Sequence, residues 1–222
     1  MTWVRRHLLT FAAMVTLFIL LLPNVVVALF SFNKPNGRYN YQWVRFSTDA
    51  WANPCGTPGI CDSLGLSLRI GVTASVVATI LGTMVAFALG RFRFRGRATT
   101  NLLIFMPMAT PEVVMGSSLL TLFVMMGLST GALAILIAHI MFCVSFVVVA
   151  VKARVASLDP RLEEAAADLG ATPVATFMKV TLPLVAPGIA AGALLAFSLS
   201  FDDYIITNIN ASPSSITFPM YV

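Results

Sequence analysis

Long apolar segments alternate with short polar segments along this chain. Three of the apolar segments, residues 8–31, 64–90 and 99–126, lie in the first two thirds of the sequence. Two more follow at residues 132–151 and 187–206. A helix of about 20 predominantly apolar residues spans the hydrocarbon core of a bilayer. The pattern therefore predicts an all-α, polytopic transmembrane bundle of five spans, organised as one domain over the whole chain.

Basic residues in the polar segments orient this bundle. Arg5 and Arg6 precede the first apolar segment, and RFRFRGR, residues 91–97, follows the second. Because Lys and Arg in short loops are retained on the cytoplasmic side, the N-terminus should be cytoplasmic and residues 32–63 should form an extracytoplasmic loop. Ten of the 14 Lys and Arg residues are then cytoplasmic, namely Arg5, Arg6, Arg91, Arg93, Arg95, Arg97, Lys152, Arg154, Arg161 and Lys179, whereas Lys34, Arg38 and Arg45 are extracytoplasmic and Arg69 lies within a span.

Composition supports a membrane location. The chain is 58% hydrophobic and 10% charged, with a mean hydropathy of +0.89, whereas soluble proteins have about 25% charged residues. The net charge of +5 does not predict nucleic-acid binding, because the basic run at residues 91–97 is a short connector between spans. Residues 8–31 are too long for the apolar core of a cleaved signal peptide, and no small-residue cleavage site follows.

No motif for catalysis or metal binding is visible in the sequence. There is no phosphate-binding G-x-x-x-x-G-K-[ST] loop, no helical pair of zinc ligands and no Ser/His/Asp set. The two histidines, His7 and His139, each stand alone in apolar surroundings. We therefore expect a protein that is not an enzyme and that binds no metal or cofactor itself.

The longest polar interruption in the second half of the chain, residues 152–183, predicts a docking element. Asp159 is a suitable N-cap, Pro160 suits the first helical position, and Gly170 suits the end of a short helix. Glu163 and Glu164 fall in the first turn, where the helix dipole favours anions. One apolar stripe at i, i+3, i+4 and i+7, half of it alanine, would let another surface approach closely: Leu162, Ala165, Ala166 and Leu169.

A second short helix should follow the glycine turn. Thr172 and Pro173 repeat the combination of a capping residue and a proline that starts a helix. Leu182 and Pro183 should end this second helix, and Pro187 should open the last span.

The spacing of residues in this loop is that of a known motif. Glu164, Ala165 and Ala166 precede Gly170 by a fixed interval, and Val180, Leu182 and Pro183 follow it. The pattern resembles the EAA loop of the membrane-spanning subunit of binding-protein-dependent ABC importers, with valine in place of the more usual isoleucine. FSLSFDDYIITNIN, residues 197–210, and the terminal ITFPMYV are similar to the second permease subunit of spermidine/putrescine-type importers.

The resemblance implies a type I ABC importer permease in a bacterial inner membrane. It further implies that Glu164 to Gly170 transmit ATP-driven motion within an ATPase-coupling loop that also includes Glu163, Val180, Leu182 and Pro183. ATP and Mg²⁺ would be bound by two partner ATP-binding subunits. A second similar permease and an extracytoplasmic solute-binding protein are the other implied partners. Three alternatives remain open: an amphipathic connector without a coupling role, a secondary transporter or channel driven by an ion gradient, and a membrane anchor for another protein.

Charged residues inside the spans are candidates for the substrate path. Glu112 follows Pro107 and Pro111 in the third apolar segment, where two prolines should break the helix. An ionisable residue beside such a break marks a pathway by default, although Glu112 could instead lie at a membrane interface.

Asp202 and Asp203 are adjacent in the last predicted span, and Tyr204 follows them. Two carboxylates near lipid favour a cationic solute, and an aromatic ring can hold an ammonium group. Because neighbouring residues of a helix point about 100° apart, one aspartate should face the path while the other caps a helix or pairs with a neighbour. We therefore predict a polyamine substrate, while metal chelates, oxyanions and phosphonates remain alternatives, as does a role for both aspartates as interfacial anchors.

Cysteine and small-residue patterns complete the picture. Cys55 and Cys61 flank a Pro/Gly turn in the extracytoplasmic loop and either form a disulfide or remain unpaired, while Cys143 is expected to be a packing residue. Residues 216–222 resemble the start of a sixth helix, as in a truncated chain or the front of a longer one.

Small residues at mostly four-residue spacing predict close helix packing: Gly71, Ser75, Ala78, Gly82, Ala86 and Gly90 in the second span, and Gly188, Gly192, Ala196 and Ser200 in the fifth.

Overall fold

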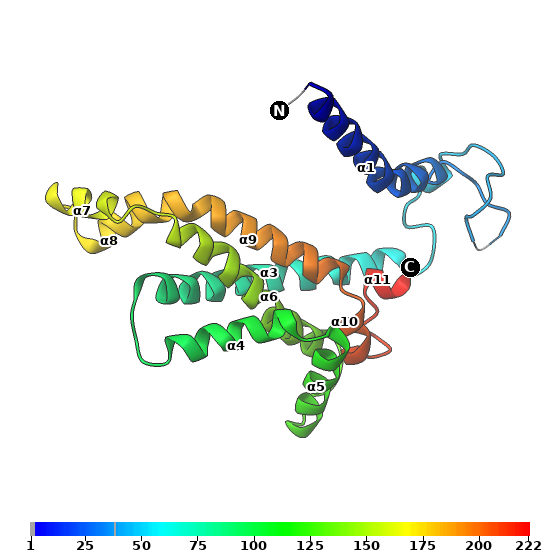
Figure 1. Cartoon of the computed structure of the whole chain (residues 1–222). Coiled ribbons are helices and arrows are strands. Elements are labelled where there is room, and N and C mark those ends of the chain that lie inside the picture. The colour runs from blue at the N-terminus through cyan, green and yellow to red at the C-terminus, as the bar shows by residue number, and fades with distance from the viewer. Residues whose placement is uncertain (1–2, 38) are drawn as a thin grey trace. The chain divides into compact units, whose positions relative to one another are not determined.

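A computed structural model describes residues 3–37 and 39–222 of the chain (Figure 1). Arg38 lies outside the described residues, as do the side chains of Arg5 and Arg6, so part of the charge pattern used for orientation has no structural counterpart here. The chain divides into two compact units, residues 1–61 and residues 62–222, which we describe separately.

The first unit consists of one long helix and an ordered loop. Helix α1, Trp3–Phe30, contains the predicted first span, and its segment His7–Phe30 is long and apolar enough to cross a membrane. The loop is organised around the buried side chain of Asn33. Its Nδ2 donates to Asn40 Oδ1 and to the Gln42 carbonyl, both at 2.7 Å, and its Oδ1 accepts from the Val44 N–H at 2.8 Å.

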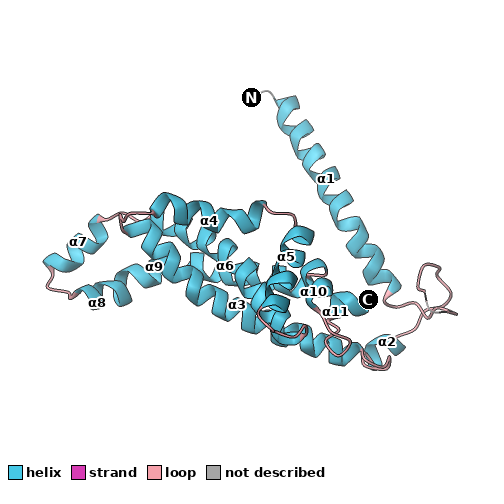
Figure 2. Ribbon diagram, turned by 90° about the horizontal axis from the view of Figure 1, so that it is seen from below, coloured by secondary structure: helices cyan, strands magenta, loops and turns pink. Residues whose placement is uncertain are grey.

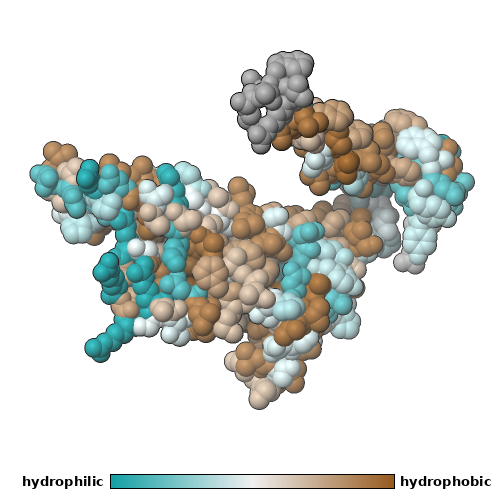
Figure 3. Space-filling view, viewed as in Figure 1, coloured by the Kyte–Doolittle hydropathy of each residue, from teal (hydrophilic) through white to brown (hydrophobic). Residues whose placement is uncertain are grey.

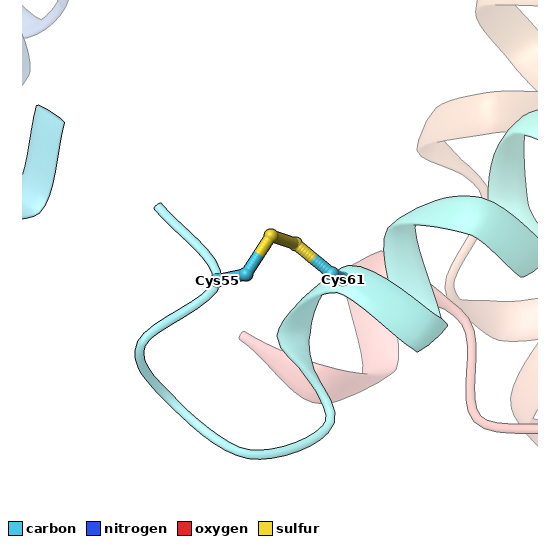
Figure 4. The surroundings of a disulfide bond; sticks show 2 residues. All are labelled: Cys55 and Cys61. Carbon is cyan, nitrogen blue, oxygen red and sulfur yellow. A yellow bond between two sulfur atoms is a disulfide. The ribbon is translucent and has the colours of Figure 1, made fainter. Parts of the chain in front are cut away.

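The same loop is closed by a disulfide bond. Helix α2, Asp49–Ala52, leads to Cys55, whose sulfur is bonded to that of Cys61 with the two Cα atoms 5.4 Å apart (Figure 4). A disulfide persists in an oxidising compartment, which is the compartment predicted for this loop from the charge pattern.

The second unit is a helical bundle (Figures 1 and 2). Helices α3 (Ile60–Arg91), α4 (Arg97–Ala109), α6 (Ala132–Ala156) and α9 (Leu182–Asp202) run side by side. Helix α6 supplies much of the buried core, because over half of its most apolar window is buried. The predicted all-α fold is thus confirmed, and no strand occurs among the residues that the structure describes.

Small residues allow these helices to pack closely, as predicted. A Cβ atom on Gly82 of α3 would lie 2.7 Å from Val147 Cγ1 of α6, and one on Gly188 of α9 would lie 2.6 Å from Arg154 Cβ of α6. Ser75 Oγ of α3 donates to the Ala193 carbonyl of α9 at 2.7 Å. Ser75 is buried, and this bond ties α3 to α9.

The third predicted span is broken, as its prolines predicted. The chain forms α4 and then α5, Glu112–Met125, which are bent by 110° at Thr110 and Pro111. Pro107, which was expected to contribute to the break, lies inside α4. Among the described residues, four helices are individually long and apolar enough to cross a membrane, and the bent pair raises the number of crossings to five if it counts as one.

The start of the last long helix also differs from the prediction. Pro183 does not end a helix, because α8 (Pro173–Thr176), the π-helical turn η1 (Phe177–Thr181) and α9 follow one another without a break. The Leu182 N–H bonds to the Phe177 carbonyl, five residues back. This change of hydrogen-bond register just before Pro183 lets the helix accept a proline in its first turn.

The remaining elements are short. After α9 ends at Asp202, α10 (Ile205–Asn210) packs against α5, and α11 (Phe218–Tyr221) begins a last helix. The predicted fifth span therefore ends four residues earlier than residue 206, at the two adjacent aspartates. Polar residues gather at the end of the unit that carries helix α7 (Arg161–Asp168) and the α3–α4 connector, while apolar side chains cover the middle of the bundle (Figure 3).

Candidate functional site

A cavity of about 340 Å³ is lined by all four residues that the sequence nominated for a substrate path. Glu112 comes from the start of α5, whereas Asp202, Asp203 and Tyr204 come from the end of α9 and the residues after it. About ninety residues of sequence separate the two groups, so the fold brings them together. Phe142, Ser198, Leu199 and Ile205 complete the lining.

Two helix breaks meet at this cavity. One lies between α4 and α5 at Thr110 and Pro111, and the other lies between α9 and α10 at Asp203 and Tyr204. Helix α10 packs against α5, so the two breaks belong to one structural neighbourhood. Non-helical backbone at membrane depth is tolerated only where protein or a water-filled cavity satisfies its polar groups. Paired breaks of this kind are typical of solute-binding regions in transport proteins.

The two adjacent aspartates have different surroundings. Asp203 is buried, and its carboxylate accepts hydrogen bonds from the Thr207 N–H at 2.7 Å and the Thr207 hydroxyl at 2.8 Å. It also accepts from the Ile206 N–H at 3.4 Å, so it caps the N-terminus of α10. Asp202 and Tyr204 are exposed beside it. Of the two carboxylates, that of Asp202 is therefore the one available to a solute, together with the exposed Glu112.

His139 does not stand alone, contrary to the expectation from sequence. Its Nε2 lies 3.2 Å from Asp203 Oδ2 and 3.0 Å from Thr207 Oγ1, and its Nδ1 lies 2.7 Å from Ser200 Oγ. These partners are 61 to 68 residues away in the sequence. No local pattern around His139 could have revealed them.

A serine, a histidine and an aspartate do lie together in the structure, although the sequence shows no Ser/His/Asp motif. Ser200, His139 and Asp203 are linked by hydrogen bonds, but Ser200 is only 5% exposed and is not among the residues that line the cavity. A nucleophilic serine must reach the carbonyl that it attacks. The network instead joins α6 to the end of α9 and the start of α10.

The polar loop at residues 152–183 folds largely as its capping residues predict. Asp159 Oδ1 accepts from the Arg161 N–H at 3.0 Å at the start of α7. Gly170 ends the helix with φ +81°, and the Gly170 and Ala171 N–H groups bond to the Ala167 and Ala166 carbonyls at 2.9 and 3.0 Å. This pair of bonds is the Schellman arrangement, which requires a left-handed residue at the position of Gly170.

The apolar stripe of α7 is exposed. Leu169 is 90% exposed, and Leu162 and Ala165 are exposed on the same helix. Glu164 is exposed as well, while Ala166 is half-buried. The described residues therefore leave this apolar stripe largely uncovered.

Glu163 is turned toward the protein instead. Its Oε1 accepts from Arg91 at 2.7 Å and from the Thr181 hydroxyl at 2.8 Å. In the sequence analysis, Arg91 indicated only the orientation of the chain. Its ion pair with Glu163 was not predicted. Val180 and Leu182, on either side of Thr181, are half-buried, and Pro183 is exposed.

The described residues contain no cluster of three or more His, Cys, Asp or Glu side chains that could hold a metal ion.

Comparisons with known proteins agree with this arrangement. A family model described as "Binding-protein-dependent transport system inner membrane component" matches residues 78–220. The putrescine transport system permease protein PotI of Escherichia coli (strain K12) is 39% identical over 207 residues, which cover 90% of this chain and 73% of the relative. The spermidine/putrescine transport system permease protein PotC of the same strain is 36% identical over 203 residues, covering 91% and 76%.

A solved structure supports the fold independently. The match is to a bacterial ABC transporter involved in the import of the acidic polysaccharide alginate, with a TM-score of 0.72 and 20% identity. It covers 100% of this chain and 80% of the other. The predicted importer permease fold is therefore confirmed.

Proposed function

Because the chain belongs to the family of binding-protein-dependent transport system inner membrane components, we propose that it forms part of the path by which a polyamine crosses the membrane. Membership in this family makes it a multi-pass inner membrane permease subunit and argues against a secondary transporter or a membrane anchor. The solute, the partners and the orientation are the proposed parts.

The observation that carries the choice of solute is the cavity at the two helix breaks. Glu112 and Asp202 offer exposed carboxylates there, while Asp203 is engaged by three hydrogen bonds from α10. Intramembrane carboxylates are costly unless they face water or meet cations. A polyamine supplies ammonium groups for them, and the exposed ring of Tyr204 suits an ammonium or methylene group. The relatives PotI and PotC carry the names of putrescine and spermidine permeases.

The proposed energy source is ATP bound with Mg²⁺ by two partner ATP-binding subunits. The exposed surface of α7, with Leu162, Glu164 and Leu169, is the proposed contact with these subunits. A second, similar permease would complete the path, and an extracytoplasmic solute-binding protein would deliver the solute. This chain itself would hydrolyse no ATP and hold no cofactor.

The proposed orientation places the N-terminus and α7 in the cytoplasm. It is supported by the cytoplasmic excess of Lys and Arg and by the disulfide between Cys55 and Cys61 in the opposite compartment. Single cysteines near Arg95 and Ala171 should resist an impermeant thiol reagent applied from outside to intact cells, while one near Asn40 should react. Labelling at Ala171 from outside would overturn the orientation.

Transport by the reconstituted complex tests the function. Proteoliposomes containing both permeases and the ATP-binding subunits should accumulate radiolabelled putrescine only when ATP, Mg²⁺ and the binding protein are present. Collapse of the proton and sodium gradients with ionophores should leave the initial rate unchanged. Selective transport of an anion, or uptake driven by an ion gradient without ATP, would contradict the proposal.

A further inference from the structure

One carboxylate joins three separate elements at the α7 end of the bundle. Glu163 lies in the first turn of α7, Arg91 is the last residue of α3, and Thr181 is the last residue of the π-helical turn η1. Arg91 and Thr181 both donate to the same oxygen of Glu163, at 2.7 and 2.8 Å. We call these three residues the Glu163 junction.

The junction is partly shielded from solvent. The side chains of Arg91 and Glu163 are 23% and 34% exposed, and Thr181 is buried. Arg91 and Glu163 therefore form an ion pair that is less screened than one on an open surface. A hydrogen bond to an ionised group at this distance also has a defined geometry. The contact can consequently hold α7 in one position relative to α3.

Each element that meets at the junction is anchored elsewhere in the bundle. A Cβ atom on Gly90, next to Arg91, would lie 2.7 Å from Val155 Cγ1, so the end of α3 packs tightly on α6. Thr181 directly precedes α9, a helix of 21 residues that ends at Asp202. At 1.5 Å per residue this helix is about 30 Å long. Thr181 and the cavity residue Asp202 therefore lie at opposite ends of one helix.

The π-helical turn gives this position a further property. Single π-helical turns are rare inside helices and occur frequently at functional sites. The turn at Phe177–Thr181 lies between α8 and α9, and Glu163 accepts a hydrogen bond from its last residue. Movement of α7 thus acts on the one place where the hydrogen-bond register of the α8–α9 helix changes.

From this geometry we propose that the Glu163 junction transmits the movement of α7 to both α3 and α9. Arg91, Glu163 and Thr181 are positioning residues in this mechanism, since none of them lines the cavity and Glu163 faces away from the exposed stripe of α7. The inference rests on the proposed function, in which α7 contacts the ATP-binding subunits. It adds a route inside this chain from that contact to the two helices.

The test compares transport with ATP hydrolysis in the same proteoliposomes. Arg91→Gln, Glu163→Gln and Thr181→Val each remove one part of the junction, and Arg93→Gln removes an exposed arginine from the same connector as a matched control. We expect all four complexes to assemble. The number of putrescine molecules transported per ATP should fall by about threefold or more in the three junction variants and stay at the wild-type value in Arg93→Gln.

One conservative variant and one exchanged pair separate loss of coupling from simple loss of structure. Thr181→Ser keeps the hydroxyl donor and should retain the wild-type ratio, and the exchanged pair Arg91→Glu with Glu163→Arg should regain part of it. Unchanged ratios in all junction variants, or equal losses of transport and ATP hydrolysis with poor assembly, would overturn the proposal.

A second measurement does not depend on putrescine. Spin labels at Met84→Cys on α3 and Asp168→Cys on α7 should show one distance population in each nucleotide state of the complex. Arg91→Gln should broaden that distribution, and an unchanged distribution would refute the junction. Failure of wild-type putrescine uptake, in contrast, would count against the proposed function while these distances still decide the junction.

Discussion

His139 and Asp203 form a buried pair at the point where α9 ends, with 3.2 Å between His139 Nε2 and Asp203 Oδ2. Their side chains are 2% and 4% exposed. Asp203 also accepts both the N–H and the hydroxyl of Thr207. The carboxylate of Asp203 thus binds the start of α10. Its neighbour Asp202 is exposed and lines the cavity.

Replacement of Asp203 should therefore affect stability first. Asp203→Ala removes the acceptor of the Thr207 hydroxyl and of the α10 N–H groups, and each buried donor left unsatisfied costs about 1–3 kcal/mol. We expect a large drop in the thermal stability of the detergent-solubilised complex, measured by size-exclusion chromatography after heating. Asp203→Asn should lose less, because an amide oxygen can still accept from Thr207.

The exposed neighbour provides the control for this experiment. Asp202→Ala should leave thermal stability unchanged, since Asp202 is exposed at the end of α9. Equal destabilisation by the two alanine variants would show that the burial of Asp203 does not distinguish the two positions.

Close packing between α3 and α6 predicts opposite effects at two glycines of the same helix. A Cβ atom on Gly82 would lie 2.7 Å from Val147 Cγ1 and 3.2 Å from the Val144 carbonyl, whereas one on Gly65 meets nothing within 4 Å. Gly82→Ala should destabilise the protein by about 1–3 kcal/mol through overpacking. Gly65→Ala should be neutral or stabilising, because alanine is the better helix former. Thermal unfolding of both variants side by side would reveal whether α3 packs on α6 at Gly82.

Local signals in the sequence account for much of this structure. Hydropathy located the long helices because a membrane requires about 20 apolar residues per crossing. Capping residues such as Asp159 and Thr172 located the short helices of the polar loop at residues 152–183, because their side chains bond to backbone N–H groups only two or three residues away. Because both partners of such a hydrogen bond lie within a few residues of each other, the sequence alone is enough to predict it.

Contacts between distant segments could not be recognised in this way. The partners of His139 lie 61 to 68 residues away, and Arg91 is 72 residues from Glu163. The continuation of the helix through Pro183 was missed because the preceding π-helical turn has no sequence signature of its own. The break at Pro111 was foreseen, but its angle of 110° and the packing of α5 against α10 have no signal in the local sequence.

The turn after α7 should be sensitive to the shape of one side chain. Gly170 has φ +81°, and no neighbouring atom would contact an added Cβ, so backbone conformation alone selects glycine. Gly170→Val should strain the turn by about 1–2 kcal/mol, because a β-branched residue disfavours the left-handed region. Gly170→Asn should be tolerated, since asparagine adopts this conformation readily.

Transport and ATP hydrolysis of the assembled complex provide the measurement for Gly170. We expect normal membrane insertion in both variants and reduced binding-protein-stimulated ATP hydrolysis in Gly170→Val alone. Normal transport by the valine variant would mean that the position of α7 does not matter for coupling.

The cavity carboxylates should control the apparent affinity for a cation. Asp202→Asn and Glu112→Gln each remove a negative charge from the lining while nearly preserving side-chain volume. An interaction with a charged group contributes about 1.5–3 kcal/mol, so each variant should raise the KM for putrescine about tenfold or more. Asp62→Asn, an exposed carboxylate at the start of α3 outside the cavity, is the matched control and should leave the KM unchanged. Uptake by the double variant at the wild-type rate would show that the cavity at the two helix breaks is not the path.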